Sequence, residues 1–138
     1  MAAALRMTLD GDRAMKRKLE SMVRKFPVAV RRGTRIVAEQ KLAITQDRVP
    51  VKTGKLKSTG KVRISLRKVL GDENISATIV YGGSGVLYAR RVHENLTARH
   101  KGGGRAKYVE SVLMESVSSI GADLARAIDL KRVAMEAK

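Results

Sequence analysis

The spacing of hydrophobic residues predicts helices toward both ends of the chain and a β-hairpin between them. Residues 5–9 alternate loosely between apolar and polar and predict a short strand. Asp12 is suited to cap a helix, and Met15, Leu19 and the apolar residues after them recur at helical spacing. We therefore expect a first helix to begin near Asp12.

Pro27 interrupts that helical pattern. A proline fits the first turn of a helix because its missing N–H needs no partner there. We therefore expect a second helix to begin at Pro27 and to run to about Arg48, with Val30, Ile36 and Val37 on its apolar stripe.

The segment after Arg48 predicts a turn followed by a hairpin. Pro50 disfavours helical geometry at the preceding residue, and Thr53-Gly54 is a turn signal. Residues 61–67 then alternate strictly between polar and apolar, which predicts a strand with one buried side. Residues 71–74 are expected to form the turn, and residues 75–81 the returning strand.

The last third predicts two flexible loops and one long helix. The loops are residues 82–87 and 97–105, both rich in glycine, and residues 88–96 between them fit either a short helix or a strand. A long helix is expected from Ala106, with Gly121 as its weak position. Its apolar face comprises Val109, Val112, Leu113, Val117, Ile120, Leu124, Ile128 and Val133. The expected class is α+β, in one domain spanning residues 1–138.

Composition adds a strong and unevenly distributed positive charge. The 138 residues are 43% hydrophobic but only 3% aromatic, so the core must be aliphatic, and the formal net charge is +16. Residues 1–107 hold 25 Lys and Arg against 8 Asp and Glu, whereas residues 108–138 hold 4 against 5. The basic part favours a polyanionic partner, and the near-neutral part favours a packing or contact role. No apolar run is long enough to predict a membrane span.

The motifs expected of enzymes are not found, and we expect no catalytic, cofactor or metal site. The chain has no cysteine. The stretch from Gly54 to Lys61 departs from the phosphate-binding loop in its glycine spacing, and it precedes a predicted strand rather than a helix. His93 and His100 lack the ligand spacing of a zinc site, and on a helix Glu94 would point away from His93. Both histidines are expected to have structural or surface roles.

Residues 48–71 contain eight Lys and Arg and no acidic residue, which predicts a contact surface for DNA phosphates or acidic proteins. No aromatic residues are interleaved to stack on bases, which argues against recognition of single strands. Together with cations farther along the chain, the candidate contacts are Lys52, Lys55, Lys57, Lys61, Arg63, Arg67, Arg90, Arg91, Arg99, Lys101 and Arg105.

Three segments together resemble the head–tail joining, or tail-completion, proteins of tailed bacteriophages. The first motif, residues 49–58 (VPVKTGKLKS), resembles the family's P-V-x-T-G-x-L pattern. The second motif, residues 88–94 (YARRVHE), is similar to Y-A-x-x-V-H-E, and the third, residues 104–110 (GRAKYVE), to G-x-A-K-[FY]-[LV]-E. One departure is Lys52, at a position where an acidic residue is common.

The resemblance implies a structural virion protein of the neck or upper tail that is assembled in the bacterial cytoplasm. It implies a ring, a hexamer with a dodecamer as the alternative, around double-stranded DNA and against neighbouring neck, connector or tail-terminator proteins. Turn or motif roles are implied for Pro50, Thr53, Gly54, Tyr88, His93 and Glu94. The hairpin and the terminal helix are the candidate ring contacts, because a closed ring needs two different faces. The alternative function is a stand-alone basic nucleic-acid-binding protein, and an enzyme such as a hydrolase is a third.

Overall fold

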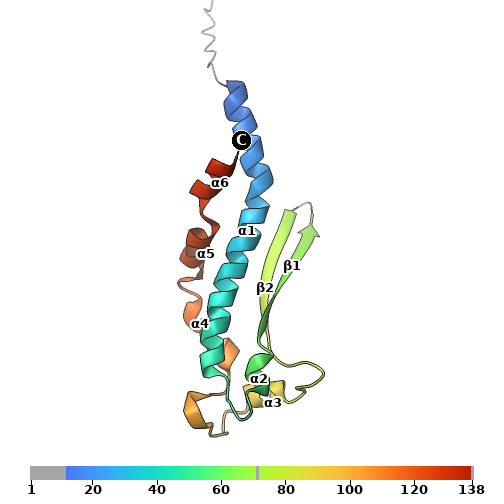
Figure 1. Ribbon diagram of the computed structural model, residues 1–138, viewed down its shortest axis with the longest axis vertical. Helices are drawn as coiled ribbons and strands as arrows, with labels where there is room; N and C mark the ends of the chain where they lie inside the picture. The colour runs from blue at the N-terminus through green and yellow to red at the C-terminus, as the bar shows by residue number, and fades with distance from the viewer. Residues whose placement is uncertain (1–11, 71, 138) are drawn as a thin grey trace, which may run out of the picture.

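A single long helix forms the spine of the molecule. The computed structural model describes residues 12–70 and 72–137, and the strand expected at residues 5–9 lies outside them. Helix α1 runs without interruption from Asp12 to Arg48, 37 residues (Figure 1). At 1.5 Å per residue it is about 55 Å long. The predicted end at Arg48 is confirmed.

The expectation of two helices separated at Pro27 is wrong, because Pro27 lies inside α1. An internal proline loses one hydrogen bond and crowds the carbonyl of Val23, at a cost of about 3 kcal/mol. Packing of α1 against its neighbours offsets this cost. A ridge at four-residue spacing that includes the buried Ser21, Ala29 and Gly33 continues past the proline. A break at Pro27 would turn one half of this ridge away from its neighbours.

The hairpin is confirmed and is longer than predicted. Strand β1, Lys61–Val69, pairs antiparallel with β2, Asp72–Val80, in a two-stranded sheet. The expected turn at residues 71–74 is wrong in part, because Glu73 pairs with Lys68 within the ladder. The connection therefore involves only the two residues between the strands, where Leu70 has a φ of 52°. Gly71 lies outside the described residues.

The C-terminal region is three helices instead of the single long one that we predicted. They are α4 (Tyr108–Ser116), α5 (Ile120–Ile128) and α6 (Leu130–Glu136). Ser116 Oγ donates to the Val112 carbonyl at 2.7 Å, and Ser119 N–H closes a tighter turn on the Ser116 carbonyl at 3.0 Å. Serine hydroxyls compete for backbone groups in this way and bend or end helices. Asp129, with a φ of 50°, caps α6 by accepting from Arg132 N–H. Gly121, the predicted weak position, lies inside α5.

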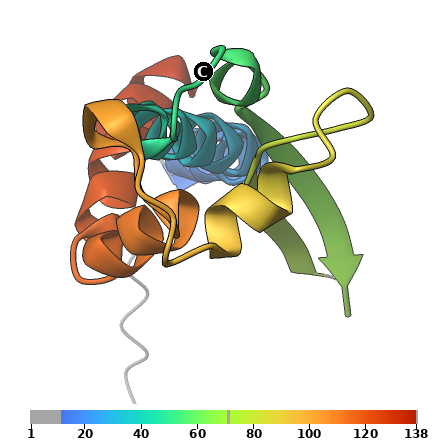
Figure 2. The ribbon, with the colours of Figure 1, turned by 90° about the horizontal axis from the view of Figure 1, so that it is seen from below.

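These bends let the C-terminal helices follow α1 along one side, while the hairpin follows another (Figures 1 and 2). Short helices α2 (Lys55–Ser58), α3 (Ala89–Glu94) and η1 (Lys101–Gly103) surround the C-terminal end of α1. Of the two alternatives for residues 88–96, the helix is correct. Helix α2 was not predicted at all. The α+β class is confirmed.

The two loops predicted to be flexible are tied at specific points. In residues 82–87, Val86 N–H donates to the Gly83 carbonyl at 2.9 Å and its side chain is buried. In residues 97–105, Asn95 Oδ1 accepts from Thr97 N–H at 3.2 Å and Ala98 N–H at 3.1 Å, forming a side-chain-capped turn. The flexibility of both loops stays a prediction.

Helices α1 and α5 approach each other closely at Gly33. A Cβ placed on Gly33 would lie 2.9 Å from Ile128 Cγ1, 3.0 Å from Ile128 N and 3.1 Å from the carbonyl carbon of Ala127. Two of these three atoms belong to the backbone, which cannot rotate away. Glycine therefore sets the distance between the two helices.

We expect Gly33→Ala to lower the free energy of unfolding by about 1–3 kcal/mol, because overpacking outweighs the better helix propensity of alanine. Gly121→Ala is the matched control, since nothing lies within 4 Å of its Cβ position. This control should leave stability unchanged or raise it by up to about 1 kcal/mol. Denaturant unfolding followed by circular dichroism measures both. Equal stabilities for the two variants would contradict the close approach.

Candidate functional site

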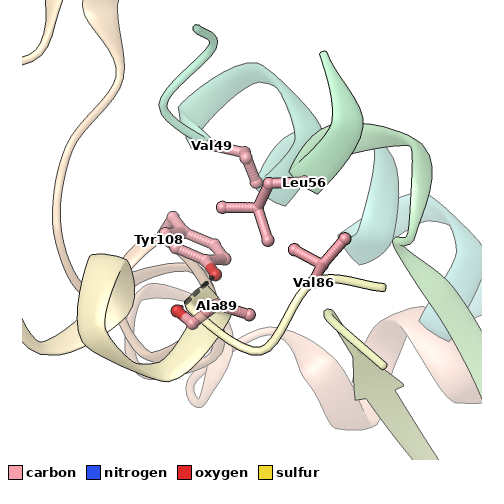
Figure 3. Packing of buried hydrophobic residues seen from close by; sticks show 5 residues of the cluster. All are labelled: Val49, Leu56, Val86, Ala89 and Tyr108. Atoms are coloured by element: carbon pink, nitrogen blue, oxygen red, sulfur yellow. Dashed lines mark hydrogen bonds between the residues drawn. The ribbon is translucent and has the colours of Figure 1, made fainter. Parts of the chain in front are cut away.

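The three motifs, which are far apart in the sequence, meet in one hydrophobic core. Val49 and Leu56 come from the first motif, Ala89 from the second and Tyr108 from the third (Figure 3). Val86 completes the cluster. The hydroxyl of Tyr108 points to the carbonyl of Ala89 at 3.5 Å, and the residue is only 1% exposed. The apolar motif positions are therefore packing positions of a common core.

Two rings pack edge-on against Tyr108. The Tyr81 ring lies 5.2 Å away at 85°, and the His93 ring 4.8 Å away at 80°. Edge-to-face pairs of this kind add stability beyond the area that they bury. Burial raises the pKa of Tyr108 to about 12. Burial also raises the pKa of Tyr81, opposed by its 2.7 Å hydrogen bond with Thr45 Oγ1.

Backbone contacts fasten the third motif to the other two. Arg105 N–H donates to the Arg48 carbonyl at 2.9 Å, and Lys107 N–H donates to the His93 carbonyl at 2.7 Å. A Cβ on Gly104 would lie 2.5 Å from Pro50 Cα, so this contact requires glycine. The motif glycine and proline thus face each other.

Ion pairs surround this core on its exposed side. Arg48 makes a bidentate pair with Glu115 at 3.0 and 2.6 Å and donates to Ser111 Oγ at 3.1 Å. Arg105 adds a contact to Glu115 at 3.4 Å. These cations, Arg48 first, hold the pKa of the Glu115 carboxyl below its usual value. The pairs connect the end of α1 to α4.

A second ion-pair group connects α3 to α4. Lys107 Nζ lies 2.6 Å from Glu94 Oε2 and 2.9 Å from Glu110 Oε2. Glu94 Oε1 lies 3.0 Å from His93 Nδ1, so the expectation that Glu94 points away from His93 is wrong. Because α3 ends at Glu94, its side chain can fold back toward its neighbour. The hydrogen bonds from Lys107 and His93 lower the pKa of Glu94.

The candidate phosphate or partner contacts separate into several groups. Lys61, Arg63 and Arg67 project from one exposed face of β1, opposite the uncharged Val80, Thr78 and Asn74 of β2. The remaining exposed cations are Lys52, Lys55, Arg90, Arg91 and Arg99, and Lys57 is half-buried. In the described parts of the chain none of these nine forms an ion pair, whereas Arg105 pairs with Glu115. The side chain of Lys101 lies outside the described structure.

An open cavity of about 620 Å³ lies beside the first and second motifs. Its lining includes Pro50 and Thr53, Gly54 with a φ of 76°, and the half-exposed Tyr88. Lys52, Arg99 and His100 also line it, and no acidic side chain among the described residues does. The Nε2 atom of His100 is buried without a hydrogen-bond partner. An apolar group carrying negative charge suits this lining.

Within residues 12–70 and 72–137, no group of three potential metal-ligating side chains occurs. No helix in these ranges is long and apolar enough to cross a membrane. No family model, curated protein or solved structure matches the chain.

Sequence reasoning missed the polar contacts that organise the site. Arg48 and Glu115 are 67 residues apart, and Thr45 and Tyr81 are 36 apart. No local pattern reports such pairs. A weak signal existed for Tyr108, since an aromatic residue is rare in this chain and lies within the third motif.

Because its phenol is buried, Tyr108 is expected to ionise at a higher pH than an exposed tyrosine. Because the folded state raises the pKa of Tyr108 from 10.0 to about 12, it favours the neutral form. The resulting stability is fully present below pH 10 and is lost as the pH rises toward about 12. Near-ultraviolet absorbance should show one tyrosine ionising near pH 12 or only with unfolding, and Tyr108→Phe should remove that step. Ionisation of all tyrosines near pH 10 in the folded protein would contradict the burial.

Proposed function

We propose that this chain is a structural subunit of the neck or upper tail of a tailed bacteriophage. Copies of it form a ring that joins or completes head and tail around the DNA path. The observation that supports this most is the convergence of the three family-like motifs on the core around Tyr108. A chance likeness of three short segments would not require them to pack together. The motif residues therefore behave as parts of one folded unit.

Exposed apolar side chains support assembly. Large apolar residues are exposed on α1, on α4 or directly after it, and on α6, among them Met15, Val23, Met114, Val117 and Met135. Extended apolar surface on a subunit marks contact sites. We expect a hexamer, with a dodecamer as the alternative, and neighbouring neck, connector or tail-terminator rings above or below.

The basic hairpin face fits a neighbour of opposite charge. A ring through which DNA slides should hold phosphates weakly, so we assign most of the unpaired cations to acidic neighbouring rings and fewer to the lumen. In a solved ring, Lys55, Lys57 and Arg63 all facing the lumen would overturn this assignment.

Interrupting the gene for this chain tests the proposed function. Phage lysates should then contain DNA-filled heads and separate tails, because the joining step fails. Electron microscopy and infectivity measure this, and supplying the intact gene in trans should restore joined particles. Normal, infectious virions made without the chain would overturn the proposal.

A stand-alone nucleic-acid-binding protein is the second candidate, favoured by Lys61, Arg63 and Arg67, which lie on one face and form no ion pair within the described structure. A salt titration of duplex-DNA binding separates the two. For a neck subunit we expect a Kd no tighter than the non-specific range of about 10⁻⁴–10⁻⁶ M at physiological salt. The triple glutamine variant of these residues serves as the comparison. Tight binding whose salt slope falls by about 3 in this variant would favour the nucleic-acid-binding protein.

A further inference from the structure

The N-terminal turns of α1 carry an apolar stripe that no described part of the subunit covers. Met15, Leu19, Val23 and Phe26 are 44% to 72% exposed. Their spacing places them on one side of the helix. Figure 1 shows that the first turns of α1 extend past the tip of the hairpin and past α6.

The stripe continues a face that is buried nearer the C-terminal end of the same helix. Met15, Leu19 and Phe26 fall in line with Gly33 and Val37, which are buried where α1 meets the other elements. The stripe is thus in line with a face of α1 that packs against other elements at Gly33 and Val37, whereas its side chains in the first turns are exposed among the described residues.

A second uncovered apolar face lies on α4. Leu113, Met114 and Val117, at the end of α4 and directly after it, are 40% to 69% exposed, while Tyr108 and Val112 on the other side of this helix are buried. The sequence of α4 contains two glutamates and no Lys or Arg. Its cationic neighbours are held in ion pairs, Lys107 with Glu94 and Glu110, and Arg48 with Glu115.

Charge determines which faces can meet between copies of a chain with a net charge of +16. Lys16 and Lys18 flank the stripe on its two sides, so two stripes that met each other would oppose like charges. The α4 face offers apolar side chains together with Glu110, which lies on the same side of the helix as Leu113, Met114 and Val117, and α4 itself carries no Lys or Arg.

We propose that the apolar stripe of α1 in one subunit packs against the α4 face of a second copy. This contact is heterologous, since it joins two different faces, and contacts of this type generate a ring when the rotation from one copy to the next closes. The contact adds to the proposed function a specific interface between subunits. It rests on that function, because the ring itself is part of the proposed function.

Two double variants test the contact, one on each face. Leu19→Ser with Val23→Ser alters the stripe, and Met114→Ser with Val117→Ser alters the α4 face. All four side chains are at least half exposed in the subunit, so the fold should persist, which circular dichroism checks. The matched controls are Val28→Ser, on another side of α1, and Met135→Ser, on α6; these residues are 65% and 75% exposed.

Sedimentation velocity in about 1 M salt measures self-association, because a Debye length of about 3 Å then screens the net charge. We expect the unaltered chain and both controls to associate alike. Each double variant should weaken association by about 10- to 100-fold. An equimolar mixture of the two double variants should form dimers, because each supplies the face that the other lacks.

Several results would overturn the contact. They are an unaltered chain that stays monomeric, face variants that associate normally, and a mixture that forms no dimers. Binding to vesicles that contain phosphatidylglycerol tests whether a lipid surface, rather than a second copy, contacts the stripe. Loss of vesicle binding in the stripe variant, with self-association unchanged, would assign the stripe to lipid. Each result is independent of the gene interruption, so the contact and the virion role can fail separately.

Discussion

The burial of Tyr108 is the interaction on which the arrangement of the motif segments depends. The chain has one Phe and no Trp, and that Phe is exposed on α1, so Tyr108 is the large side chain around which Val49, Leu56 and Ala89 pack. Segments from three parts of the sequence reach it, and each contributes a residue from a short helix or from beside one. Their mutual order follows from sharing one buried ring, reinforced by the backbone hydrogen bonds of Arg105 and Lys107.

Local sequence patterns predicted an element correctly where a single interaction determines it. Strict alternation in residues 61–67 predicted the hairpin because one side of the strand is covered by α1 and the other is not. The end of α1 was predictable from Pro50. The predicted break at Pro27 was wrong because packing along the whole ridge outweighs the local cost of the proline. Only the tertiary structure reveals this packing. The break after Ser116 was hidden for the opposite reason, since the apolar spacing continues through it.

The candidate site was predictable only in part. The sequence identified the basic segment, and the hairpin register then placed Lys61, Arg63 and Arg67 on one face. The ion pairs that neutralise Arg48, Arg105 and Lys107 depend on contacts across the fold and left no sequence signal. Composition alone would therefore count these three cations as available to a partner. In the structure they form ion pairs with residues of α4 and α3.

This division of the cations bears on how a ring could form. Glu94 and Glu115, beside the core, connect helices, as does Asp123 of α5, which pairs with Lys41 of α1 at 3.1 Å. The cations that they bind lower the pKa values of these three carboxylates. These ion pairs leave the net charge of each subunit at +16. Bringing several such subunits together accumulates repulsion that apolar contacts alone must overcome. An acidic neighbouring ring, or DNA in the lumen, would relieve that repulsion, so in the proposed function subunit association and docking favour each other. Reciprocal coupling of this kind needs no conformational switch, only a polyanion that binds the assembled ring better than the separate subunits.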